Sequence, residues 1–165
     1  MVEGFKGAEA VLSCLGLHGL SLRPVTLYSE SVKCIVEAME KAGVRRLVAM
    51  TSWCTKSESG NPFFIEWIIK PLFIGRHLAD MAVMEDFLAT KKTLVDFTTV
   101  RPAGLTDTPE TDREIKALVE KQWVPSEKVT GREASQIARA DVARFMLSAI
   151  GERAFFGHPV AIGWP

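Results

Sequence analysis

Residues 8–16 read Ala-Glu-Ala-Val-Leu-Ser-Cys-Leu-Gly, a short apolar run that ends at a glycine. A run of this length, bounded by a glycine, is typical of a buried β-strand. From Thr26 to Ala42 apolar residues recur at helical spacing, and Gly43 stands where a glycine commonly ends a helix. The next run, Arg46–Met50, is again short and apolar. Strand, helix and strand in this order predict a βαβ unit with parallel strands.

The second half of the chain continues the alternation of helices and strands. The sequence predicts a helix marked by Leu78, Met81, Met84 and Leu88, a strand over Leu94–Val100, a helix capped by Asp141 with Val142, Phe145 and Met146 on its buried face, and a strand over Val160–Ile162. This pattern predicts an α/β fold, a doubly wound parallel sheet with helices on both faces. The length of 165 residues indicates a single domain over residues 1–165.

Composition and charge argue against several classes of protein. The chain carries 20 basic and 20 acidic residues and has no net charge, whereas nucleic-acid phosphates require clustered Lys and Arg. Its first residues lack the apolar segment of a signal peptide. The most apolar stretch, Phe63–Ile74, is interrupted by charged residues and a proline and is too short to span a membrane. We therefore expect a soluble protein that binds neither nucleic acid nor membrane.

Cysteine and histidine are too scattered to predict a metal site. The three cysteines are Cys14, Cys34 and Cys54, and the three histidines are His18, His77 and His158. An odd number of cysteines without a C-x-x-C pair favours a reducing cytoplasm over a disulfide framework. None of these residues has the spacing of metal ligands. We interpret the cysteines as single buried residues and the histidines as single surface residues.

The expected ligand site follows from the topology of parallel sheets. Ligands of such sheets bind outside the carboxyl ends of the strands. In this chain those ends are Leu15–Gly16, Thr51–Trp53 and Pro102–Leu105. This rule predicts where a ligand binds and leaves the reaction open.

The same strand ends carry a resemblance to a known family. The segments are Ala10-Val-Leu-Ser-Cys-Leu-Gly16, Leu47-Val-Ala-Met-Thr-Ser52, Phe97-Thr-Thr-Val-Arg-Pro-Ala-Gly-Leu-Thr106 and Ala138-Arg-Ala-Asp-Val-Ala143. They resemble the later strands of atypical short-chain dehydrogenase/reductases of the NmrA-like type, and in particular the flavin reductase/biliverdin reductase B-like group. The resemblance implies a Rossmann-like fold with NADP or NAD as cofactor. It also implies hydride transfer to a flavin, a tetrapyrrole-like molecule or another small conjugated acceptor.

The resemblance further implies which residues form the site. Ser52 is similar to the family's serine near the nicotinamide and the substrate, where a hydroxyl can orient a carbonyl, and it is the expected catalytic residue. The residues expected to bind the cofactor are Cys14, Leu15, Gly16, Thr51, Ser52, Pro102, Ala103 and Gly104. An alternative stays open for these strand ends, because serine, proline and glycine also serve turns for backbone reasons alone.

Two features of the family are missing from the sequence. No Tyr-x-x-x-Lys motif is present, because the single tyrosine, Tyr28, is followed by Val32 at that spacing, and Met81 stands where the lysine could lie. The glycine-rich phosphate loop is also absent, so we expect the N-terminal half of the sheet to be missing. The segment Gly16-Leu-His-Gly19 is interpreted as a turn, because Leu22 takes the place of the third glycine.

These departures lead to three expectations. Binding of NADP or NAD is weak or lost in this chain, because the glycine loop supplies the main contacts with the pyrophosphate. The alternative to an active reductase is a catalytically inactive remnant or isoform that acts through protein contacts. An exposed sheet edge at the first predicted strand would also permit self-association.

The remaining singled-out residues receive structural interpretations. Arg101 is expected to pair at the surface or to cap a helix, and Glu85 to face solvent or pair locally. The apolar group around the insert is interpreted as core or as a lid over the substrate, with a partner surface as the alternative. Its members are Phe63, Phe64, Trp67, Ile68 and Ile69.

Overall fold

A computed structural model describes residues 1–17, 19, 23–126 and 133–165. The elements in chain order are α1 (Val2–Phe5), β1 (Ala10–Ser13), α2 (Leu27–Ala42), β2 (Arg46–Met50), the π-helix η1 (Ile65–Ile74), α3 (Gly75–Thr90), β3 (Asp96–Pro102), β4 (Gly104–Thr106), β5 (Lys116–Val119), the short helix η2 (Glu133–Ser135), β6 (Gln136–Ala138), α4 (Arg139–Ser148), the short helix η3 (Arg153–Phe155) and β7 (His158–Gly163).

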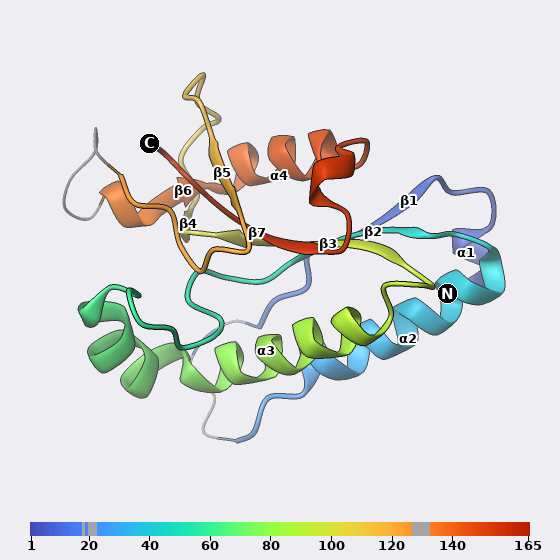
Figure 1. The fold of residues 1–165 in the computed structure, drawn as a ribbon, viewed down its shortest axis with the longest axis horizontal. Coiled ribbons are helices and arrows are strands. Elements are labelled where there is room, and N and C mark those ends of the chain that lie inside the picture. The colour runs from blue at the N-terminus through green and yellow to red at the C-terminus, as the bar shows by residue number, and fades with distance from the viewer. Residues whose placement is uncertain (18, 20–22, 127–132) are drawn as a thin grey trace.

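The central sheet has the strand order β1-β2-β3-β7-β5. The first four strands are parallel, and β5 alone runs antiparallel, against β7. A separate parallel pair, β4 with β6, lies outside this sheet. Helices α2 and α3 lie on one face of the sheet and α4 on the other (Figure 1). The α/β fold predicted from the sequence is therefore confirmed, with a sheet that is mostly parallel.

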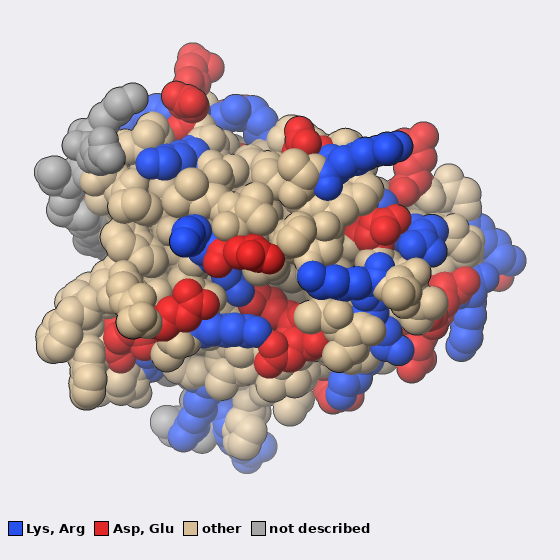
Figure 2. Space-filling model, viewed as in Figure 1, with Lys and Arg blue, Asp and Glu red and all other residues tan. Residues whose placement is uncertain are grey.

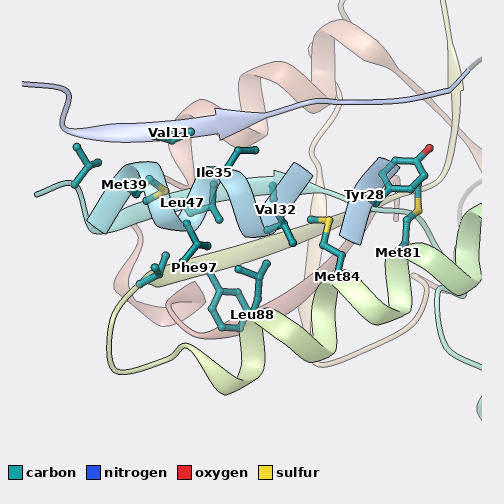
Figure 3. Close-up of a cluster of buried hydrophobic side chains, with 14 of the residues drawn as sticks. Val11, Tyr28, Val32, Ile35, Met39, Leu47, Met81, Met84, Leu88 and Phe97 are labelled. Carbon is teal, nitrogen blue, oxygen red and sulfur yellow. The ribbon is translucent and has the colours of Figure 1, made fainter. Parts of the chain in front are cut away.

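One hydrophobic core joins α2 and α3 to the sheet. Leu47 of β2 lies between Val11 of β1 and Phe97 of β3, and all three pack against these helices (Figure 3). Helix α2 ends as predicted: Gly43 has a φ of 75°, and its N–H donates back to the Glu40 carbonyl. A left-handed backbone conformation at this position costs the least free energy when the residue is glycine.

A second core joins α4 to the opposite face. Val142, Phe145 and Met146 pack there against β3 and β7, which confirms the buried face predicted for this helix. Asp141, however, does not cap the helix, which begins two residues earlier at Arg139. Its buried carboxylate instead accepts hydrogen bonds from the backbone N–H and hydroxyl of Thr111. Burial raises the pKa of Asp141, but these bonds, together with a hydrogen bond and the positive charge from Arg144, outweigh that effect and hold the pKa below its ordinary value.

Some predicted boundaries shift for local reasons. The first strand covers only Ala10–Ser13, and the third covers Asp96–Pro102 instead of Leu94–Val100. The third strand starts later because the backbone N–H groups of Leu94 and Val95 both donate to the Lys91 carbonyl and so form a turn.

The insert before α3 contains the π-helix η1, and the interpretation of the insert's large apolar side chains as core was wrong. Phe63 and Trp67 are each 71% exposed, and their rings stack with centroids 6.0 Å apart. Phe64 and Ile68 are exposed as well, and Ile69 is half-buried. None of the described helices is both long enough and apolar enough to cross a membrane.

Candidate functional site

A cavity of about 680 Å³ lies at the carboxyl ends of β1, β2 and β3. All eight residues expected at the site line it: Cys14, Leu15, Gly16, Thr51, Ser52, Pro102, Ala103 and Gly104. They meet because parallel neighbouring strands end at the same edge of the sheet. Their role in binding a cofactor stays a prediction.

Backbone hydrogen bonds hold Ser52 at this edge. The N–H of Thr51 donates to the Val100 carbonyl at 2.8 Å, and the N–H of Trp53 donates to the Pro102 carbonyl at 2.9 Å. Ser52, between them, lines the cavity, and its hydroxyl makes no hydrogen bond to another described residue. The hydroxyl that secures the turn belongs to Thr55, which donates to the Ser52 carbonyl at 2.6 Å. The Ser52 hydroxyl is therefore available to a ligand.

A buried ion pair lies directly behind the cavity. Arg101 and Glu85 are 2% and 5% exposed, and the guanidinium donates to both carboxylate oxygens. Glu85 also accepts a hydrogen bond of 3.0 Å from the hydroxyl of Thr51, which lines the cavity. The expectations of a surface Arg101 and a solvent-facing Glu85 were therefore wrong. Glu85 lies four residues after Met81 on the buried face of α3, and this spacing is the signal that could have located it.

His77 is a second polar residue of the cavity that the sequence did not predict there. It projects from α3, lines the cavity and is 8% exposed, which corrects its interpretation as a surface histidine. Its Nε2 has no hydrogen-bond partner among the described residues, and its ring lies edge-on to Tyr28. A buried nitrogen without a partner costs free energy, so a polar ligand group that reached it would be favoured.

The other cysteines and histidines offer less chemistry. Cys14 and Cys34 are exposed, contrary to the expectation that they are buried. Cys54 is buried as expected, and burial raises the pKa of its thiol to about 11, so it carries no thiolate at neutral pH. His158 pairs with Glu120, and His18 lies outside the described residues.

A carboxylate already occupies two N–H donors at the N-terminus of the helix that follows β1. The backbone N–H groups of Tyr28 and Ser29 donate to the carboxylate of Asp80, at 2.8 and 3.3 Å. Asp80 is buried and comes from α3. A phosphate in this place would meet a carboxylate where other nucleotide-binding folds present open N–H donors.

The segment Gly16–Gly19 was expected to form a turn. Gly16 and Gly19 both line the cavity, whereas His18 and Leu22 lie outside the described residues.

Among the described lining residues the one Lys or Arg is Arg139, and it pairs with Asp107 at 2.6 Å. The described part of the cavity is therefore mainly apolar, with uncharged polar groups at its strand ends. On the face shown in Figure 2, basic and acidic side chains are interspersed.

Comparison with protein-family models finds a match over residues 1–153 to a family described as NAD(P)H-binding. No curated protein sequence is similar enough to this chain to match it. The family match confirms the resemblance that the sequence suggested.

Solved structures with the same fold include three bacterial proteins. A protein described as a candidate NADH-flavin reductase from Streptococcus pneumoniae TIGR4 is 18% identical with a TM-score of 0.72, and the match covers 100% of this chain and 76% of that one. A short-chain dehydrogenase/reductase from Veillonella parvula in complex with NADP is 19% identical with a TM-score of 0.68, over 99% and 66% of the two chains. A protein from Burkholderia pseudomallei described as exported is 18% identical with a TM-score of 0.70, over 99% and 75%.

These identities show the fold alone. The chain spans about two thirds of the length of the Veillonella protein and three quarters of the other two. The remainder of each of those proteins has no counterpart in the 165 residues.

Proposed function

The chain belongs to this NAD(P)H-binding family, and from that premise we propose that the cavity beside Ser52 receives the nicotinamide end of NADPH or NADH. The protein then acts as an oxidoreductase toward a flavin, a tetrapyrrole-like molecule or another small conjugated acceptor. The observation that carries the proposal is the Ser52 hydroxyl, which makes no hydrogen bond to another described residue and lies in a cavity at the ends of three parallel strands whose described lining is mainly apolar.

The residues of the cavity fit a nicotinamide ring. Met50, Leu78 and Met81 offer apolar walls for its flat faces and exclude water from them. Ser52 can donate to the carboxamide oxygen or to a carbonyl of the acceptor, and the unpartnered nitrogen of His77 offers a second polar contact. When bound, the cofactor would supply the hydride, and these side chains would orient the rings between which it passes.

Replacing Ser52 by Ala should lower kcat about tenfold or more while changing KM little, because an orienting donor acts mainly in the transition state. Steady-state rates with a flavin acceptor, at NADPH concentrations up to several millimolar, measure both constants. Ser148→Ala is the matched control, since Ser148 lies at the exposed end of α4 and its hydroxyl donates to the Phe145 carbonyl. An unchanged kcat in Ser52→Ala would leave Ser52 with a backbone role only.

The 165-residue chain should bind NADPH weakly, with a dissociation constant in the millimolar range. The sequence has no glycine-rich phosphate loop, Asp80 occupies the N-terminus of α2, and Arg139 is already paired. The pyrophosphate and adenosine therefore add little affinity, and reduced nicotinamide mononucleotide should bind about as well as NADPH. Fluorescence titration of both nucleotides measures the ratio. A micromolar constant for NADPH, or a large preference for it, would contradict this proposal.

A catalytically inactive form that acts through protein contacts is the alternative, and the free edge of β1 favours it. Among the described residues β1 pairs only with β2, so one side of its backbone has no partner strand.

We also propose a reducing compartment such as the cytoplasm for the protein. The three cysteines form no disulfide, which supports this location.

A further inference from the structure

The exposed apolar side chains of the insert before α3 share one side of the helix. They are Phe63, Phe64, Trp67, Ile68 and Leu72, and each is at least 41% exposed. They recur four or five residues apart, which is about one turn of a π-helix, whose hydrogen bonds join residues five apart. We call these five residues the η1 face. It lies at one end of the molecule, where the surface is mostly uncharged (Figure 1, Figure 2).

The two charged residues of η1 are mostly covered and already paired. Glu66 and Lys70 form an ion pair of 2.7 Å, and their side chains are 17% and 11% exposed. Glu66 also accepts hydrogen bonds from the Ser57 hydroxyl and the Asn61 amide, which belong to the segment before the helix. This network ties the polar side of η1 to the rest of the protein. It therefore holds the η1 face toward the solvent.

The area of the η1 face suits neither an idle surface nor a stable dimer. Its five side chains present on the order of 500–600 Å² of apolar surface. The largest apolar patch of a soluble monomer is about 300–600 Å² and often has a function. A stable dimer buries about 800 Å² on each partner and adds hydrogen bonds along a polar rim. The η1 face alone offers less area and no polar group apart from one indole N–H, so a second copy is a poor occupant.

A lipid bilayer fits the η1 face better, because it requires no polar complement. Trp and Phe side chains favour the boundary between headgroups and acyl chains, and a helix can lie there with its apolar side about 5–10 Å deep. Trp67 and Phe63, the two most exposed residues of the face, supply such rings. Glu66 and Lys70 would stay on the protein side, so no charged group has to lose its water.

We propose that the η1 face attaches the protein to the surface of an electrically neutral lipid bilayer. Attachment needs neither nucleotide nor acceptor, so the proposal goes beyond the proposed function. The expectation of no membrane partner rested on charge and on the length of the apolar stretch. Neither argument applies to a helix that lies in the interface of a neutral bilayer without spanning it.

Co-sedimentation of the whole chain with phosphatidylcholine vesicles tests the proposal. The chain should bind these vesicles, and added anionic lipid or high salt should change its affinity less than about threefold, because the charges of η1 are already paired. No binding, or binding to anionic vesicles alone, would refute the proposal. Since no nucleotide is present, the result is independent of the proposed reductase function.

Paired substitutions test whether the η1 face makes the contact. The double variant Trp67→Glu with Leu72→Glu should bind vesicles about tenfold more weakly or less, because two carboxylates would have to lose water. The matched control, Val83→Glu with Leu147→Glu, adds the same charge at exposed apolar positions of α3 and α4 and should bind like the unaltered chain. An equal loss in both variants would contradict the proposal. A chain that ignores vesicles but associates through the η1 face would show an interface between copies instead, and the proposal would fail.

Brominated phosphatidylcholine, which quenches indole fluorescence at short range, shows which part of the chain enters the bilayer. The unaltered chain should be quenched, whereas Trp67→Phe should still bind and lose most of the quenching. Trp53 and Trp164 are buried and Trp123 is half-buried, so Trp67 is the indole that the bilayer would reach. Quenching that persists in Trp67→Phe would place another segment in the bilayer and overturn the proposal.

Discussion

Replacing Arg101 by Met should lower the free energy of unfolding by about 3–5 kcal/mol. The substitution leaves the carboxylate of Glu85 inside the protein without its guanidinium partner, and both side chains are almost fully buried. It also removes the hydrogen bond of 2.8 Å from Arg101 to the Lys121 carbonyl. A domain of this size has about 5–15 kcal/mol of stability in total, so the substitution should remove a large share of it. Urea denaturation followed by circular dichroism measures the loss.

Arg45→Met is the matched control for this prediction. Arg45 pairs with Asp96 at 3.3 Å, but the two side chains are 58% and 36% exposed. Water already solvates both charges, so losing this pair should cost less than about 1 kcal/mol. The double variant Arg101→Met with Glu85→Leu should regain part of the stability, because no unpaired charge remains. A loss in Arg101→Met no larger than that in Arg45→Met would contradict the role assigned to the buried pair.

This ion pair also shows where sequence patterns fail. Periodicity located Arg46–Met50 as a strand to the residue and the end of α2 at Gly43, because burial on a strand or on one helix face repeats along the chain. The pairing of Arg101 with Glu85 joins a strand to a helix and leaves no periodic signal. A charge inside an apolar run was therefore interpreted as exposed, although a buried partner can compensate for it.

The sequence predicts where the candidate site lies, but it predicts only some of the residues that line it. A topological rule placed the ends of β1, β2 and β3 together, and the structure brings all eight expected residues to one cavity. His77 was missed, because its burial depends on how α3 packs against Tyr28. The antiparallel strand β5 was also missed. It consists of four residues, and its place in the sheet depends on β7, which lies about forty residues later.

We further propose that the 165-residue chain self-associates through β1. Among the described residues β1 lies at the edge of the sheet, and its backbone pairs on one side only. No Lys or Pro interrupts Ala10–Ser13, and such residues are the usual protection of an edge. Leu12 of β1 is 37% exposed, and Leu15 and Leu17, which follow β1 and line the cavity beside Ser52, are 42% and 46% exposed. A second copy can add its own β1 there, since two identical edge strands can pair antiparallel with each other.

Leu12→Lys should convert an associating chain into a monomer. The new ammonium group would lie beside the joined strands, where pairing would strip it of water without providing a partner charge. Leu147→Lys is the matched control, because Leu147 is 60% exposed and lies on α4 instead of the edge strand, and this variant should still associate. Size-exclusion chromatography with light scattering, at several protein concentrations, gives the mass of each form. A monodisperse monomer for the unaltered chain would contradict the proposal, and so would an equal shift in both variants, because the effect would then follow added charge and not the edge of the sheet.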